Sequence, residues 1–128
     1  MYEKFGQFID GKWQKSQNNE TYEVINPATE EILGHASKAC REDVEKALLS
    51  SESGFKKWKN TTPWERSKVL RRIADKIREK KDILAKWMTL EVGKPLAEGV
   101  GEAGGAADIF EWNSEAVSYT HLTLPTSG

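Results

Sequence analysis

The chain has few of the residues that build covalent cross-links or metal sites. Its 128 residues include one cysteine, Cys40, and two histidines, His35 and His121. A lone cysteine forms no internal disulfide, and it cannot supply the several thiolates of a structural zinc cluster. Two histidines leave little material for another kind of metal site. The sequence therefore indicates neither a disulfide scaffold nor a metalloprotein, and we expect no metal ligands in it.

Long apolar runs and an excess of one charge are also missing. No apolar run approaches the roughly 18 residues that span a bilayer, and residues 1–5 hold no hydrophobic signal core. Basic residues number 19 and acidic residues 20, for a net charge of -1. Binding to a polyanion through bulk charge is not expected. We predict a cytoplasmic protein with no membrane and no nucleic-acid partner.

The charges are nevertheless unevenly distributed along the chain. Residues 65–89 hold 9 basic and 4 acidic residues, whereas residues 90–128 hold 1 basic and 6 acidic residues. The basic stretch at 66–86 could follow phosphates, but its interleaved acids are also typical of an ordinary solvated helix face. A basic segment that lies beside an acidic one can be screened within the fold. Neither segment by itself indicates a charged partner.

The first third of the chain has the pattern of short strands. Residues 5–13 predict two strands joined by a tight turn at Asp10-Gly11. Residues 21–25 alternate and contain β-branched side chains, and residues 31–36 have a similar composition. Asn and Pro at 26 and 27 favour a turn between these two segments. We expect a β-hairpin or meander followed by helices.

Helical patterns begin near residue 40. Apolar residues at intervals of three and four place one apolar face on residues 44–58. A second helix has a capping box, with Thr62 at the N-cap, Pro63 at the first helical position and Glu65 at the third. Its apolar face is Val69, Leu70, Ile73, Ala74 and Ile77. The tryptophans at 58, 64, 87 and 112 recur at helical positions, which favours the core over a stacking platform.

Two more helical segments complete the pattern, which gives three to four amphipathic helices. One runs through residues 83–90 and ends at Gly93, because glycine suits the left-handed cap and Pro95 cannot continue the helix. The other covers about residues 96–116 and contains glycines at 99, 101, 104 and 105. Such a helix is intrinsically poor and needs close packing against a neighbour.

Two features could carry chemistry. Gly99, Gly101 and Gly104 match the G-x-G-x-x-G pattern of dinucleotide sites, but no strand precedes them, which favours a close-packed helix. Cys40 lies near a helix N-terminus, where the helix dipole can activate a thiol. Its alternative interpretation is a small polar cap residue, because only His35 is close in sequence. His35 is interpreted as a surface or packing residue in a strand.

Several motifs occur in order along residues 5–116. They are FIDGKW (8–13), VINPATEEI (24–32), DVEKA (43–47) with Phe55 and Trp58, Arg66 with Leu70, MTLEVGKPLAE (88–98) with Gly101 and Glu102, and FEW (110–112). Together they resemble the N-terminal segment of the aldehyde dehydrogenase superfamily. The stretch 88–98 is most similar to the succinate-semialdehyde dehydrogenase group.

This resemblance implies an α/β fold and the oxidation of an aldehyde, such as succinate semialdehyde, to a carboxylic acid with NAD or NADP. In the family a cysteine thiolate attacks the carbonyl, an oxyanion hole holds the adduct, and hydride passes to the nicotinamide. A glutamate-activated water then hydrolyses the thioester. All these groups lie beyond the matched segment in the family. We therefore expect no catalytic and no cofactor-binding residue in this chain, and no activity or cofactor binding by it alone.

The family also suggests roles for the strands and for one cation site. Family hairpins join the oligomerisation sheet, and family helices pack on the cofactor domain, which implies a homo-oligomer for the full-length protein. Some members bind a cation through backbone near the position of Ile25 and an acidic side chain near Glu102. The resemblance therefore suggests a backbone cation site at these positions, whereas we predict no metal-ligating side chain in this chain.

The last residues depart from the family pattern. Residues 1–116 are interpreted as an incomplete N-terminal part of the cofactor-binding and oligomerisation region. Residues 117–128 carry no charge and are rich in β-formers and turn residues. They are interpreted as a non-family, artefactual tail of a truncated gene model. The alternative function is a self-standing interaction module that uses the hairpin edge.

Overall fold

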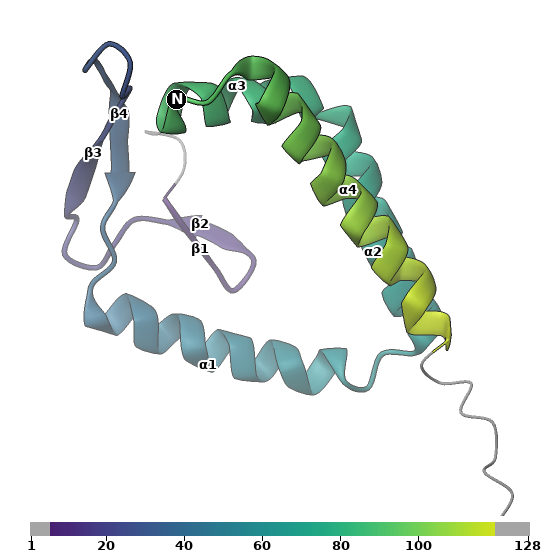
Figure 1. The fold of residues 1–128 in the computed structure, drawn as a ribbon. Helices are drawn as coiled ribbons and strands as arrows, with labels where there is room; N and C mark the ends of the chain where they lie inside the picture. Colours follow the sequence, from purple (N-terminus) through teal and green to yellow (C-terminus); the bar gives the residue numbers. More distant parts are fainter. Residues whose placement is uncertain (1–5, 120–128) are drawn as a thin grey trace, which may run out of the picture. The chain divides into compact units, whose positions relative to one another are not determined.

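The computed structural model describes residues 6–119, which form two small hairpins followed by four helices (Figure 1). The strands are β1 (Gln7–Ile9), β2 (Lys12–Gln14), β3 (Thr21–Ile25) and β4 (Ile32–Ser37). The helices are α1 (Arg41–Trp58), α2 (Pro63–Glu79), α3 (Lys81–Val92) and α4 (Leu96–Tyr119). The prediction of a β-hairpin or meander followed by helices is confirmed, with the strands forming two separate hairpins. His121 and most of the predicted tail lie outside the described residues.

The chain divides into two compact units. The first contains the residues up to Asn60 together with Leu90–Gly93, and the second contains Thr61–Thr89 together with the residues from Lys94 onward. The first unit therefore holds both hairpins, α1 and the last residues of α3. The second unit holds α2, most of α3, and α4.

The first hairpin has the turn that its sequence predicts. β1 pairs antiparallel with β2, with Phe8 opposite Trp13 and Ile9 opposite Lys12. Asp10 and Gly11 both have positive φ angles, 53° and 74°, as a two-residue type I′ turn requires. Ile9 is 8% exposed, and β1 lies against α1. The hairpin thus buries its Ile9 face, while the rings of Phe8 and Trp13 are exposed on the other face.

The second hairpin is closed by an asparagine turn. β3 pairs antiparallel with β4, with an irregular register between Val24 and Ile25. The Asn26 side-chain oxygen accepts the Ala28 N–H at 3.0 Å, and the Asn26 carbonyl accepts the Glu30 N–H at 2.8 Å. These are the local bonds by which asparagine favours a turn. The turn predicted at this position is confirmed.

The end of α3 belongs to the same unit as the asparagine turn. Gly93 has a φ of 76°, and a Cβ at this position would lie 2.9 Å from Cγ of Pro27. Glycine therefore serves two purposes here, the left-handed helix end and the close approach to the proline ring.

The second unit begins with the predicted capping box. The Thr62 hydroxyl accepts the Glu65 N–H at 3.3 Å, and a Glu65 carboxylate oxygen accepts the Thr62 N–H at 3.0 Å. Pro63 occupies the first position of α2. The helix start is therefore fixed by local hydrogen bonds, as the sequence predicts.

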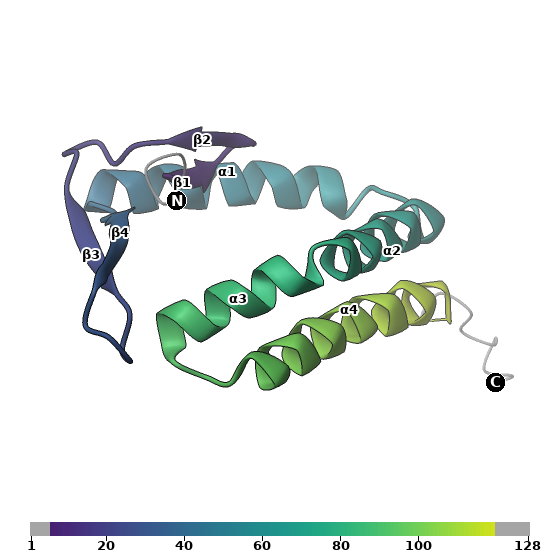
Figure 2. The same cartoon turned by 90° about the horizontal axis from the view of Figure 1, so that it is seen from above.

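Helix α4 runs back antiparallel alongside α2 (Figure 2). The buried residues between these helices are small: Ala74 on α2, and Ala103, Ala107 and Ser114 on α4. Small side chains let two helices approach closely but bury little apolar area each. The helix extends to Tyr119, beyond the predicted end near 116, because adding residues to an existing helix is far easier than starting one.

The predicted close packing of α4 against a neighbour is confirmed, and one of its four glycines lies at a close helix contact. Gly99 is buried, and a Cβ there would lie 3.0 Å from the Ala85 carbonyl oxygen and 3.1 Å from its Cα. A Cβ at Gly101, Gly104 or Gly105 would meet nothing within 4 Å among the described residues. One glycine therefore permits helix contact, and the other three lie on an open face of α4.

Candidate functional site

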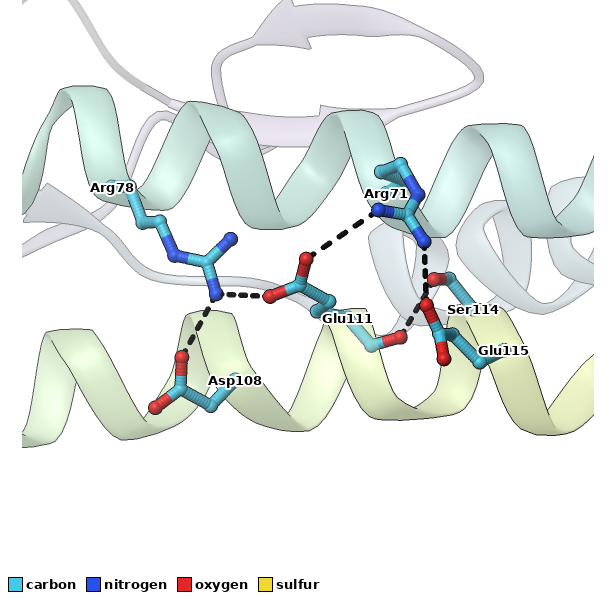
Figure 3. A network of polar contacts seen from close by, with 6 residues as sticks. All are labelled: Arg71, Arg78, Asp108, Glu111, Ser114 and Glu115. Carbon is cyan, nitrogen blue, oxygen red and sulfur yellow. Dashed lines mark hydrogen bonds and ion pairs between the residues drawn. The ribbon is translucent and has the colours of Figure 1, made fainter.

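Two arginines of the basic segment, Arg71 and Arg78, pair with three acidic residues of α4 (Figure 3). Arg78 binds Asp108 at 2.8 Å and Glu111 at 2.5 Å. Arg71 binds Glu115 at 2.8 Å and Glu111 at 3.5 Å. Glu111 lies between the two guanidinium groups and gives one carboxylate oxygen to each. The hydrogen bonds from Arg78, first to Asp108 and then to Glu111, raise the pKa of this arginine above its usual value.

This network explains the uneven charge of the sequence. Arg71 and Arg78 are seven residues apart, two helical turns, so they share one face of α2. Their partners on α4 follow the spacing i, i+3, i+7 and likewise share one face. Two arginines of the basic segment and three acids of the acidic segment therefore pair within the second unit, in the way that the sequence suggested. Arg71 and Arg78 are already paired with acidic residues of the same chain, which weakens the alternative that the basic segment binds phosphates.

The first unit is centred on a buried carboxylate. Asp43, at the third position of α1, is 3% exposed. One of its oxygens accepts the Ser16 hydroxyl at 2.5 Å, the Gln7 amide at 3.2 Å, and the Cys40 N–H and thiol at 3.0 and 3.2 Å. The Gln17 N–H lies at 3.2 Å from its other oxygen. The carboxylate therefore joins β1, the segment after β2 and the start of α1.

The charged form of Asp43 is strongly favoured. The hydrogen bond from Ser16 lowers the pKa of Asp43 well below its usual value, and the bonds from Cys40 and Gln7 act in the same direction. Burial opposes them but does not prevail. The sequence placed Asp43 only in the DVEKA motif, near the start of a helix. The donors from residues 7–17 were missed, because no local pattern predicts a contact across 27 or 36 residues.

We expect Asp43→Asn to lower the melting temperature of the chain by several degrees. Asparagine offers one oxygen and turns an amide toward donors that the carboxylate accepts, which leaves buried groups unpaired. The acid sensitivity should also change. Because the folded-state pKa of Asp43 is lowered, its contribution is present above about pH 4 and is lost as the pH falls below that value. Circular dichroism melts between pH 7 and pH 2 measure both effects.

Glu45→Gln provides the matched control, since Glu45 lies on the same helix but is exposed and pairs with Arg41 on its own helix. This control should leave the melting temperature nearly unchanged. Equal melting temperatures for the wild type and Asp43→Asn at pH 7 would contradict a central role for the buried carboxylate.

Cys40 is the N-cap residue of α1, the position that the cap interpretation gave it. Its thiol donates to the Asp43 carboxylate, and its N–H bonds the same group. A nucleophilic thiol needs a base that accepts its proton and is oriented by a third group. The contacts of Cys40 are those of a residue that fixes the helix start. His35 lies exposed in β4, opposite Glu23 of β3.

The G-x-G-x-x-G pattern does not fit a dinucleotide. In such sites, glycines free the backbone N–H groups at a helix N-terminus to approach phosphate. Here the glycines lie inside α4, and the Gly99 N–H already bonds the Pro95 carbonyl at 3.1 Å. Gly99 also packs on Ala85. The described residues thus provide no phosphate cradle at this pattern.

The expected cation site, with backbone near Ile25 and an acidic side chain near Glu102, stays a prediction, because these two residues belong to different units of the chain. Among residues 6–119, no three histidine, cysteine or acidic residues cluster in a way that could hold a metal ion. The Glu102 carboxylate binds the Lys94 ammonium at 2.5 Å, so a positive charge from the chain itself already neutralises it.

An open groove of about 600 Å³ lies along α2 and α3. Four of its lining residues are apolar, namely Val69, Ile73, Ile77 and Leu84. The others are Arg72, Asp75, Lys76, Glu79 and Lys80. The lining combines an apolar floor with charged groups and holds neither a thiol nor an imidazole. It has the character of a packing surface rather than of a catalytic site.

Large apolar side chains are exposed on both units. The buried hydrophobic residues described are Ile9 and four alanines. Trp58, Trp64 and Trp112 are 40%, 66% and 71% exposed, so the core interpretation is wrong for these three tryptophans. Other exposed residues are Val44, Leu48, Leu49, Phe55, Leu96 and Ile109. Apolar faces of this extent mark surfaces that pack against further protein.

Comparisons with known proteins agree with this picture. A sequence model with the description "Aldehyde dehydrogenase family" matches residues 13–126. The chain is 43% identical over 121 residues to succinate-semialdehyde dehydrogenase [NADP(+)] 2 of Schizosaccharomyces pombe, covering 94% of this chain and 24% of that protein. It is 40% identical over 108 residues to glutarate-semialdehyde dehydrogenase of Pseudomonas aeruginosa, covering 84% of this chain and 22% of that protein.

Solved structures give the same result. Betaine aldehyde dehydrogenase of Staphylococcus aureus in complex with NAD+ superposes with a TM-score of 0.84 at 34% identity, over 87% of this chain and 22% of that chain. An NAD-dependent aldehyde dehydrogenase of Sinorhizobium meliloti superposes with a TM-score of 0.83 at 30% identity, over 87% and 23%. The chain spans about a quarter of the length of these relatives.

The matched range includes most of residues 117–128, and the artefactual origin of that tail stays a prediction. Within residues 6–119, no helix is both long enough and apolar enough to cross a membrane.

Proposed function

The chain belongs to the aldehyde dehydrogenase family, and from that premise we propose that it is the N-terminal part of an NAD(P)-dependent enzyme that oxidises an aldehyde to a carboxylic acid. The observation that carries the proposal is the match of 94% of this chain to 24% of a semialdehyde dehydrogenase. The exposed apolar faces of both units support it, because a larger fold would cover them.

For the whole protein we propose a substrate that carries an aldehyde at one end and a carboxylate at the other, such as succinate semialdehyde. Two relatives support this substrate class, since their names give succinate and glutarate semialdehyde. The cofactor is NAD or NADP. A homo-oligomer, a cytoplasmic location and the absence of nucleic-acid and membrane partners complete the proposal.

In this proposal the chain supplies structure rather than reacting groups. Asp43 fixes the first hairpin on α1, and the network around Glu111 holds α4 on α2. Cys40 caps a helix. The nucleophile, the base and the nucleotide site come from other parts of the enzyme, so the chain is inactive by itself.

A chimera tests the proposal directly. Residues 1–116 replace the matching segment of the Schizosaccharomyces pombe enzyme, and NADP-dependent oxidation of succinate semialdehyde is measured. We expect kcat/KM of the chimera to lie within about tenfold of the parent value, because the groups that react remain those of the parent. A tenfold loss corresponds to about 1.4 kcal/mol of transition-state stabilisation. The parent with the segment deleted is the control and should be inactive.

A chimera that is soluble and as inactive as the deletion control would count against the proposal. It would favour the second candidate, a self-standing interaction module. The observation behind that candidate is the pair of two-stranded hairpins, whose outer edges could add a strand from a partner. A cooperative melt of a monodisperse oligomer would support it further, whereas strong binding of a hydrophobic dye fits an uncovered part of a larger fold.

A further inference from the structure

Helix α4 is poorly suited to stand on its own. Four of its residues are glycines, and each glycine in a helix interior disfavours the helix relative to alanine. At three of these glycines, none of the residues in 6–119 lies within 4 Å of the Cβ position. The outer face of the helix also exposes Ile109 and Trp112. Contacts on the opposite face must therefore hold the helix in place.

The apolar part of that opposite face is small. Ala103 and Ala107 are 4% and 0% exposed, and Ala74 of α2 is fully buried. A methyl group removes little apolar area from water compared with a leucine or a phenylalanine side chain. The alanines permit close approach, but they supply only part of the stabilisation that α4 needs.

Among the described residues, four ion pairs join α2 to α4, and they lie on the second half of α4. They connect Arg71 and Arg78 with Asp108, Glu111 and Glu115. Glu111 contacts both arginines, so its carboxylate links the pairs into one network (Figure 3). The Ser114 hydroxyl is buried beside them and donates to the Glu111 carbonyl at 2.6 Å.

We propose that five side chains form an ionic clasp that holds the second half of α4 helical against α2, and that high ionic strength opens the clasp. The members of the clasp are Arg71, Arg78, Asp108, Glu111 and Glu115. Its side chains are between 38% and 74% exposed, so counterions can reach them. The Debye length falls to about 3 Å at 1 M salt. The apolar contacts between the alanines are not weakened by sodium chloride in this way. This proposal is independent of the enzymatic one.

Hydrogen–deuterium exchange of the whole 128-residue chain tests the clasp. At 50 mM sodium chloride, Glu111→Gln should make amides in the second half of α4 exchange roughly three- to tenfold faster than in the wild type. At 1 M sodium chloride, the wild type should exchange as fast as this variant. Glu45→Gln is the matched control: it breaks an ion pair within α1 and should leave α4 unchanged.

A full reversal of the clasp charges separates the ionic effect from a general loss of folding. R71E and R78E together place five acidic residues side by side, and α4 should lose its protection. Adding D108K, E111R and E115K restores opposite charges, so protection at low salt should return and should again be lost at 1 M. Equal α4 exchange in the wild type and Glu111→Gln at low salt, or wild-type protection unchanged at 1 M, would overturn the proposal.

Discussion

Purified and mixed with succinate semialdehyde and either NAD or NADP, the 128-residue chain should form no NADH or NADPH above the level of its Cys40→Ala variant. Enzymes accelerate their reactions by factors of about a million or more. For the oxidation of an aldehyde by NAD(P), an acceleration of this size needs an activated nucleophile and a bound cofactor. The one thiol of the chain donates to the Asp43 carboxylate at a helix start. The glycines of α4 lie inside a helix.

Absorbance at 340 nm measures this expectation, with the intact Schizosaccharomyces pombe enzyme in the same assay as the positive control. Turnover by the wild-type chain that disappears in Cys40→Ala would show that the chain contains its own nucleophile. Such a result would refute the proposal that the reacting groups lie elsewhere, even if the chimera were active.

The elements that the sequence predicts well are those specified by neighbouring residues. The turn at Asp10 and Gly11, the asparagine turn, the box of Thr62 and Glu65, and the end of α3 at Gly93 all depend on bonds within a few residues. Local dihedral preferences and local hydrogen bonds are properties of short segments. These features were therefore predictable without knowledge of the tertiary structure.

For contacts between distant segments, the sequence indicated only which segments carry opposite net charge. The opposite net charges of residues 65–89 and 90–128 suggested mutual screening. The individual pairs could be predicted only if the two helices were already known to be antiparallel. In that case the seven-residue spacing of Arg71 and Arg78 matches the spacing of Asp108, Glu111 and Glu115 on the facing helix. The donors to Asp43 carried no such signal, because hydroxyl and amide groups occur throughout the chain.

The burial of Trp64 and Trp112 was wrongly predicted for a different reason. Periodicity shows which face of a helix is apolar, but it does not show whether the chain contains the surface that covers that face. Trp112 lies near Ile109 on an apolar face of α4 that remains exposed in this chain. Trp64 lies at the start of α2, outside the apolar face of that helix, and the Lys68 ammonium lies over its ring at 5.1 Å. The same reasoning explains Gly101, Gly104 and Gly105, whose open face is free of contacts within the described residues.

Gly99→Leu should be the most destabilising glycine substitution in α4, at a cost of about 1–3 kcal/mol. The Cβ alone would lie 3.0 Å from the Ala85 carbonyl oxygen and 3.1 Å from its Cα. Backbone atoms cannot rotate away as a flexible side chain can, so α4 must shift to admit the larger residue. Overpacking of a tight contact typically costs this amount. The shift would also separate α4 from α3, which a loss of helical signal in thermal melts would report.

Gly101→Ala is the matched control in the same helix, two residues away. Nothing lies within 4 Å of its Cβ position among the described residues, and alanine favours a helix over glycine by about 0.5–1 kcal/mol. The control should therefore raise the melting temperature while Gly99→Leu lowers it. The two substitutions change the melting temperature in opposite directions because Gly99 lies on the covered face of α4 and Gly101 on the open face. If both substitutions raised the melting temperature, the packing of Gly99 on Ala85 would be refuted. If both lowered it, the outer face of α4 would be covered in solution, through contacts between copies of the chain.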